Sequence, residues 1–153
     1  MSFFNSLDTS ASGLSSQRIR MDILAQNIAN VNTTRTAEGG PYMRRTVIFE
    51  AMQPQNSFGS VLAGAMGANM PTASGIGKGV RVREIVTDQT PGPFVFDPGH
   101  PDANADGYVE QPNVNMVMEM VNMISASRSY EANITAMNVT RAMINRTFEI
   151  STR

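Results

Sequence analysis

A chain of 153 residues, of which 41% are hydrophobic, is long enough to form one domain with a real core. Its net charge of −1 gives no overall attraction for nucleic acid or for an anionic membrane, so we expect neither as a partner. It has no cysteine, which excludes disulfides, cysteine-ligated zinc and thiol catalysis.

The first residues do not have the features of a cleavable signal peptide. Residues 1–17 lack both a positively charged start and an apolar core of adequate length. No stretch of the chain reaches the ~20 apolar residues that span a bilayer. If the protein leaves the cytoplasm, another export route must carry it.

From residue 3 to residue 31 the sequence predicts a helix with an apolar stripe. Large apolar residues recur every seven positions, as they do in helices that pack lengthwise against another helix. Gly13 and many Ser and Thr residues weaken the intrinsic helicity, so we expect this helix to need its partner. The predicted assembly seam on this helix consists of Leu7, Leu14, Met21, Leu24, Ile28 and Val31.

The middle of the chain, residues 33–112, has a different character. Residues 42–50 and 80–87 are β-branched, partly alternating runs bounded by Gly and Pro, and they predict two strands that pair like a hairpin. Residues 94–96 are a candidate for a short third strand. Residues 51–77 carry no charge and much Gly, Ala and Met, which favours a loop that orders only against a neighbour. Contact of this loop with lipid or a channel is the weaker alternative.

Residues 102–107 (DANADG) match the first half of an EF-hand calcium loop. That loop closes with a bidentate Glu at its twelfth position, which here is Asn113, preceded by Pro112. A turn of Asp, Asn and Gly that leads into the next helix explains the residues without a metal. His100 is the only histidine and has no second His or Cys to complete a metal site. A soluble helical module that binds calcium or another ligand here is the alternative function.

Residues 113–150 predict the long helix around which the chain is organised. Its seam positions alternate at spacings of four and three with no interrupting Gly or Pro. Eight of the ten positions are apolar or aromatic, and the other two are Ser127 and Arg141; the eight are Met116, Met120, Met123, Tyr130, Ile134, Met137, Ile144 and Phe148. The predicted length is ~55 Å. The other faces carry few charges and many Asn, Ser and Thr, which suits close contact with several neighbouring chains. An amphipathic helix in an ordinary bundle is the alternative.

The two stripes predict a mainly α fold. We expect an antiparallel, coiled-coil-like pair of long N- and C-terminal helices, with a small β-element and a long loop inserted between them. The predicted segments are 1–32 (N-terminal helix of a core layer), 33–112 (inserted β and loop region) and 113–153 (C-terminal helix). The sequence has no phosphate-binding Gly loop and no Ser-His-Asp arrangement, so we expect no enzyme activity, no cofactor and no metal.

Motifs at both ends of the chain resemble those of bacterial flagellar rod and hook proteins. The N-terminal motif comprises residues 11–14 (ASGL), 20–22 (RMD) and 25–33 (AQNIANVNT). The C-terminal motif comprises residues 108–109 (YV), 112–115 (PNVN), 119–120 (EM) and 127–133 (SRSYEAN). Two separate motifs in the same order make the resemblance specific. The short length and residues 34–42 and 97–101 point within the family to the proximal rod. The motif residues are Asn27, Asn30, Asn32, Thr33, Pro112, Asn113, Asn115, Arg128, Tyr130, Glu131 and Asn133.

This resemblance implies a structural subunit that polymerises with copies of itself and with sister rod proteins. The resulting helical tube spans the periplasm in the basal body, transmits torque and surrounds the export channel. The resemblance also implies export through the type III channel of the flagellum without a cleaved signal. Further partners implied are the rod-base adaptor, the membrane-embedded ring and the export gate, with no nucleic acid and no small-molecule substrate.

The asparagines of the N-terminal motif have two explanations. Asn30 or Asn32 can end the first helix, since Asn tolerates left-handed backbone at a C-terminal cap. Alternatively, the amides of Asn27, Asn30 and Asn32 satisfy backbone groups of a neighbouring subunit. The first explanation is the simpler one for each residue, and the resemblance favours the second for the motif as a whole.

Overall fold

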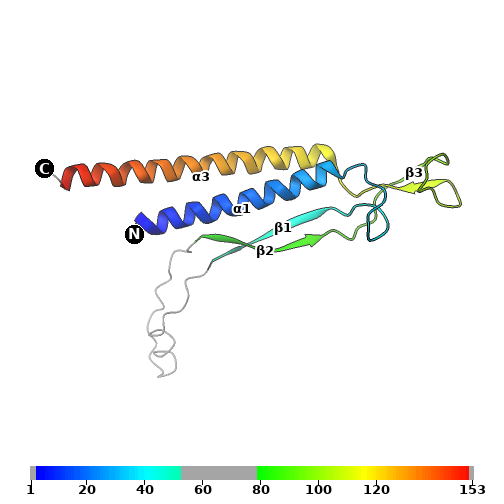
Figure 1. Cartoon of the computed structure of the whole chain (residues 1–153), viewed down its shortest axis with the longest axis horizontal. Coiled ribbons are helices and arrows are strands. Elements are labelled where there is room, and N and C mark those ends of the chain that lie inside the picture. The colour runs from blue at the N-terminus through cyan, green and yellow to red at the C-terminus, as the bar shows by residue number, and fades with distance from the viewer. Residues whose placement is uncertain (1–2, 53–78, 152–153) are drawn as a thin grey trace, which may run out of the picture.

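The structure is a computed structural model that describes residues 3–52 and 79–151. In chain order its elements are α1 (Phe3–Ala29), β1 (Arg45–Ala51), β2 (Val80–Thr87), β3 (Phe94–Phe96), β4 (Tyr108–Glu110) and α3 (Met116–Ser151). Figure 1 shows an elongated molecule in which the two helices run side by side and the β3 region projects from one end. The loop expected at 51–77 lies almost wholly outside the described residues. Within the described part, no helix has the length and apolarity of a membrane span.

The predicted antiparallel helix pair is confirmed. The N-terminus of α1 lies beside the C-terminal half of α3 (Figure 1). Helix α3 begins at Met116 rather than at residue 113, because Asn115 is its N-cap: the Asn115 Oδ1 atom accepts a hydrogen bond from the Met118 amide at 3.1 Å. Residues 113–114 therefore stay outside the helix.

Helix α3 continues beyond the start of α1. Asn27 contacts Glu119, and a Cβ atom added at Gly13 would lie 3.0 Å from Asn133 Oδ1. In an antiparallel pair, the numbers of two facing residues have a constant sum. Here the sum is 146 for Asn27 with Glu119 and for Gly13 with Asn133, so Phe3 lies opposite residue 143. The remaining eight residues of α3, 144–151, extend roughly 12 Å past the first residue of α1. Gly13, which weakens the helix by itself, allows this close approach of the two helices.

Only part of the predicted α3 seam faces α1. Met123, Tyr130, Met137 and Ile144 are half-buried, whereas Met116, Met120, Ile134 and Phe148 are exposed. Glu119, which precedes Met120, is almost completely buried. Ala126, which precedes Ser127, is buried as well. At those positions the contact with α1 thus lies one residue earlier than the apolar stripe, and it uses small or polar side chains. As a surface for assembly, the exposed half of the stripe stays a prediction.

The α1 stripe faces inward to a greater degree. Leu24 is buried and the other residues are half-buried: Leu7, Leu14, Met21, Ile28 and Val31. Val31 follows the last helical residue, Ala29. This stripe therefore contributes to the packing of α1 within the single chain.

Two small antiparallel sheets complete the described fold. Strands β1 and β2 pair from Arg45↔Thr87 to Ala51↔Val80, with a bulge between Ile48 and Phe49. This is the predicted hairpin-like pair, although β1 begins at Arg45 instead of at residue 42. Strands β3 and β4 pair separately. The sequence did not predict β4, because three residues between a turn and a proline are too short to show a period.

The start of β2 is held on α1 by two serines one helical turn apart. Ser12 Oγ accepts a hydrogen bond from the Val80 amide (3.1 Å), and the Ser16 hydroxyl donates to the Val80 carbonyl (3.3 Å). Gly79 has φ +125°, and a Cβ atom there would collide with Ser12 Oγ. Only glycine suits this position, which fixes where the sheet meets the helix.

Candidate assembly surfaces

A buried polar network lies where α1 ends and α3 begins. Asn27 is completely buried. Its Oδ1 accepts hydrogen bonds from the Tyr42 hydroxyl (2.9 Å) and the Arg45 amide (3.0 Å), and its Nδ2 donates to the Arg45 carbonyl and to Glu119 Oε2 (both 2.8 Å). Both amide hydrogens and both acceptor sites of the side chain are used, so its burial leaves no polar group unpaired.

Glu119 carries the negative charge of this network. Its side chain is 1% exposed, and its Oε1 lies 2.8 Å from both Nε and Nη2 of Arg44. A carboxylate buried at this depth needs such a charged partner, because desolvation alone would be very costly. The fork of Arg44 and the amide of Asn27 together compensate the charge. One acidic residue thus joins both helices to the start of β1.

Asn113 holds the strand connection in place. Its Oδ1 accepts from the Arg44 amide (2.6 Å), and its Nδ2 donates to the carbonyls of Asp88 (3.0 Å) and Thr90 (2.8 Å). Close by, a Cβ atom added at Gly92 would collide with the Gln111 carbonyl. The segment between β2 and β3 is therefore packed tightly against the residues that lead into α3.

Two groups near this junction have shifted pKa values. Burial raises the pKa of Tyr42 above its ordinary 10.0; nearby Arg45 lowers it and Glu119 raises it, both by less. Hydrogen bonds from the Thr90 hydroxyl (2.7 Å) and amide (3.0 Å) lower the pKa of Asp88. Tyr42 thus stays a hydroxyl donor to Asn27 at neutral pH, and Asp88 stays a carboxylate acceptor.

The outer side of α3 carries an apolar patch, which we call the outer patch: Val117, Met120, Val121 and Ile124. Their exposed fractions are 69%, 50%, 56% and 54%. At 100° per residue, Val117, Val121 and Ile124 point away from the side that holds Glu119 and Ala126. Contiguous exposed apolar surfaces of this kind often mark sites where another protein binds.

A second exposed apolar surface lies on the β3–β4 sheet. Phe94, Phe96 and Tyr108 are 61%, 62% and 44% exposed. Phe96 pairs with Tyr108 across the two strands, and their rings pack edge to face with centroids 5.2 Å apart. On the other face of the same sheet Val109 is buried. Val95, the partner of Val109 on that face, is 42% exposed, so the aromatic face is the more exposed of the two.

Comparison with known proteins identifies the family. The model of the flagella basal body rod protein matches residues 7–35, and that of the flagellar basal body rod FlgEFG protein C-terminal region matches residues 105–150. The flagellar basal-body rod protein FlgC of Bacillus subtilis (strain 168) is 44% identical over 154 residues, 98% of this chain and 99% of that protein. FlgC of Borreliella burgdorferi is 46% identical over 149 residues, 94% of this chain and 93% of its own. The chain belongs to the FlgC family of flagellar basal-body rod proteins.

The structure separates the FlgC-family motif residues into two groups. The first group shapes the single chain: Asn27, Asn113 and the buried Pro112 form the junction, Asn115 caps α3, and Asn133 lies against Gly13. Tyr130 is half-buried, and Thr33 accepts a hydrogen bond at its carbonyl from the Tyr42 amide (3.0 Å). The second group is exposed: Asn32, Arg128 and Glu131.

The two explanations for the asparagines therefore apply to different residues. Asn30 supports the end of α1, because its Nδ2 donates to the Gln26 carbonyl (2.9 Å) and its Oδ1 accepts from the Thr33 hydroxyl (3.2 Å). Asn27 neither ends the helix nor has hydrogen-bonding capacity left for a neighbour. It ties α1 to β1 and α3 instead. Contact of the exposed Asn32 with a neighbouring subunit stays a prediction.

Sequence reasoning missed Tyr42, Arg44 and Glu119 as members of the junction. A signal existed for Glu119, which is the only charged residue between Glu110 and Arg128. A lone acid within such an uncharged stretch indicates a buried ion pair or a cap. Its partners were not visible in the sequence, because Asn27 lies 92 positions away.

The residues of the calcium-like motif serve the loop between β3 and β4. Asp102 Oδ2 accepts from the Thr34 hydroxyl (2.8 Å), and Oδ1 lies 3.6 Å from Arg35 Nη1. Asn104 Oδ1 accepts from the amides of Asp106 (3.0 Å) and Tyr108 (2.8 Å). Residues 3–52 and 79–151 contain no group of three or more His, Cys, Asp or Glu side chains placed to hold a metal. Nothing in the structure or the relatives supports a calcium- or ligand-binding module.

Proposed function

We propose that this chain works as a structural subunit of the rod in the bacterial flagellar basal body. The similarity to FlgC rod proteins over 98% of the chain supports this function, as do the rod-family matches on both terminal helices. A structural rod protein does not belong to an enzyme class.

The outer patch of α3 is the observation that supports polymerisation. Three of its four large apolar side chains, Val117, Val121 and Ile124, face away from α1, and a single chain gains nothing by exposing the patch to water. A heterologous contact forms when one surface of a subunit packs against a different surface of the next subunit. Repeated contacts of this kind build a helical assembly unless they close into a ring. We propose that copies of this chain and sister rod proteins pack onto both helices in this way.

The predicted seam acquires two roles in this proposal. Its half-buried members Met123, Tyr130 and Met137 lie opposite α1 and hold the two helices together. Its exposed members contact neighbouring subunits: Met116, Met120, Ile134 and Phe148. The segments 1–32 and 113–153 then form the packed layer of the tube, and 33–112 forms the inserted part. The exposed motif residues Arg128 and Glu131 lie on the same helix and are candidates for polar contacts between subunits.

The finer position of the subunit follows from the family resemblance. We propose that it lies in the proximal rod, within the periplasm-spanning tube that transmits torque and surrounds the export channel. Its export then uses the type III channel and no cleaved signal. The rod-base adaptor, the membrane-embedded ring and the export gate are the further partners in this proposal.

Charge placed on the outer patch tests the assembly role. We expect Val121→Asp and Ile124→Asp to abolish swimming and to remove assembled rods from electron micrographs, while the exported chain remains detectable by immunoblot. Both side chains are more than half exposed, so the isolated chain should tolerate the change. The matched control is Asn138→Asp, an exposed polar position on the same helix about four turns beyond the outer patch. Normal swimming of both patch variants would contradict the proposal.

A further inference from the structure

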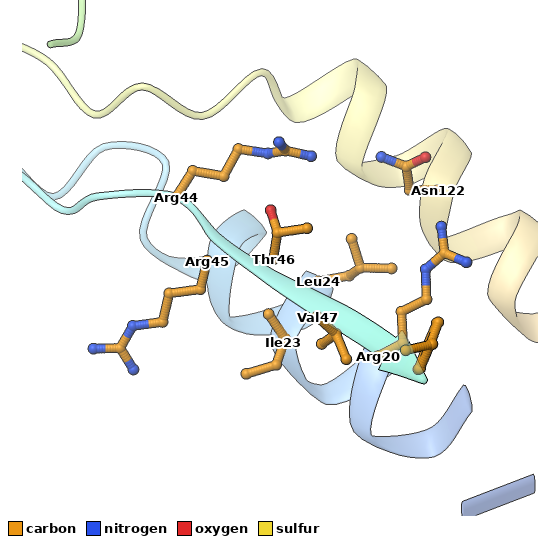
Figure 2. A pocket seen from close by; sticks show the side chains of 9 residues that line it. Arg20, Ile23, Leu24, Arg44, Arg45, Thr46, Val47 and Asn122 are labelled. Carbon is orange, nitrogen blue, oxygen red and sulfur yellow. The ribbon is translucent and has the colours of Figure 1, made fainter. Parts of the chain in front are cut away.

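An open pocket of about 200 Å³ lies where α1, β1 and α3 meet. Its apolar lining comprises Ile23, Leu24, Val47 and Phe49, and its polar lining includes Arg20, Thr46 and Asn122. Figure 2 shows Arg20 extending from α1 toward the side of α3 that carries Asn122. The junction network uses none of these seven side chains.

Within the described residues, Arg20 is the arginine that faces this pocket without an acidic partner. Arg44 is paired with Glu119, and Arg45 points away from the pocket in Figure 2, with its guanidinium 6.0 Å from the centre of the Tyr42 ring. Arg20 is half-buried, and no acidic side chain in the described parts of the chain lies within salt-bridge distance of it. A guanidinium beside an apolar floor suits a carboxylate that is flanked by apolar side chains.

The chain itself carries carboxylates next to apolar side chains in the region of the β3–β4 sheet. No Lys or Arg occurs between Arg83 and Arg128, whereas five acidic residues lie between residues 88 and 110: Asp88, Asp97, Asp102, Asp106 and Glu110. Asp102 is occupied by Arg35 and Thr34. Asp97 directly follows β3, Asp106 lies two residues before β4, and both are exposed.

We infer that the Arg20 pocket receives the β3–β4 hairpin of a second copy of this chain, with the Asp106 carboxylate against the Arg20 guanidinium. The acidic charge and exposed rings of the hairpin complement the positive charge and apolar lining of the pocket. Within one molecule the hairpin projects beyond the end of the helix pair (Figure 1), so the contact joins two copies. It brings together two different surfaces and therefore repeats from copy to copy. The inference rests on the proposed rod function, which places copies side by side.

Cysteine crosslinking tests the contact in assembled rods. The natural chain has no cysteine, so any disulfide between two copies requires the introduced residues. Thr46 lines the pocket and Ala105 precedes Asp106, and both are exposed. We expect the combined variant Thr46→Cys and Ala105→Cys to form dimers and higher multiples of the chain when isolated basal bodies are oxidised. Each single-cysteine variant should remain monomeric, and Thr46→Cys combined with Asp8→Cys is the control pair.

Charge reversal in the same crosslinking variant tests the ion pair. Arg20→Glu should lower the yield of crosslinked chain about tenfold, because it places two like charges together. Adding Asp106→Arg should restore the yield to within about twofold, and Arg20→Lys should keep most of it. An unchanged yield in Arg20→Glu, or no restoration by the second reversal, would overturn the ion pair.

The failures of the two proposals are distinguishable. Basal bodies that contain the double-cysteine chain but yield no crosslink between copies overturn this inference alone. The same holds if mass spectrometry finds the chain linked to a different rod subunit instead of to itself. Absence of the unsubstituted chain from purified basal bodies would overturn the proposed rod function.

Discussion

The two ends of the helix pair differ in whether the single chain provides partners for their side chains. At the junction end, Asn27, Arg44 and Glu119 saturate one another within a single chain. At the opposite end, α3 extends past α1, and its residues Phe148 and Ile150 are 68% and 78% exposed. The junction therefore folds with contacts that one chain provides by itself. The overhanging end has large apolar side chains whose burial requires other molecules.

This contrast separates changes that damage the chain from changes that damage the assembly. Substitutions at the junction should lower the stability of the isolated protein. Substitutions on the overhang should leave that stability nearly unchanged and still prevent rod formation. The expected effect on the isolated chain is greatest at the junction.

Glu119→Ala should have the largest effect. It leaves the Arg44 guanidinium and the Asn27 amide without their partner in a buried site, which costs about 3 kcal/mol of unfolding free energy. Urea unfolding of the purified chain, followed by helical circular dichroism, measures the loss. Glu131→Ala, an exposed acid on the same helix, should change the stability by under about 0.5 kcal/mol. Equal stabilities of the two variants would remove the distinction between the junction and the rest of α3.

Asn27→Ala should cost about 2–3 kcal/mol, because the Tyr42 hydroxyl and both backbone groups of Arg45 lose their partner. Asn30→Ala is the matched control from the same motif. Its side-chain amide bonds only to the Gln26 carbonyl and the Thr33 hydroxyl at the end of the helix, so the cost should stay below about 1 kcal/mol. The same urea titration compares the two. A larger loss in Asn30→Ala would mean that the motif acts mainly as a helix end.

The pH dependence of the junction should follow Tyr42. Because burial raises its folded pKa above 10.0, the stability from its protonated hydroxyl is complete below pH 10.0 and is lost as the pH rises through the folded pKa. Thermal melts recorded between about pH 9 and pH 11 should show this loss. Tyr42→Phe removes the ionisation, so its melting temperature should fall less steeply over that range. Identical slopes would show that Tyr42 does not govern the alkaline loss.

Phe148→Ser should have the smallest effect on the isolated chain and a large one in the cell. The side chain is mostly exposed, so the unfolding free energy should change by less than about 0.5 kcal/mol. Swimming should nevertheless be lost, because the subunits lose an apolar contact. Asn145→Ser, an exposed polar position on the same overhang, should keep both properties. A Phe148→Ser strain that swims normally would exclude the overhang as an assembly surface.

Local signals account for what the sequence predicted correctly. The seven-residue period gave the helix pair, and β-branched runs gave β2 and β3. The first strand was expected three residues too early, since Tyr42 and Arg44 read as strand residues but belong to the junction. Hydrogen bonds that join residues 15 to 92 positions apart leave no periodic trace. The junction could therefore not be assembled from the sequence alone.

The displaced seam on α3 has a different physical origin. The amphipathic pattern predicts that the large apolar residues of a helix face its partner. The two helices instead approach closely at Gly13 and Ala126, where small side chains allow it. Met120, one position after the buried Glu119, stays exposed. In a subunit that assembles, apolar residues indicate surfaces that pack within the chain and also surfaces that pack against other chains.

An electron cryomicroscopy map of isolated basal bodies, with each subunit traced, tests the central claim most directly. The expected result is that Val117, Val121, Ile124 and Phe148 lie within about 4.5 Å of side chains from neighbouring subunits. A map in which these residues face water, while the chain is present in the rod, would contradict assembly through the outer side of α3.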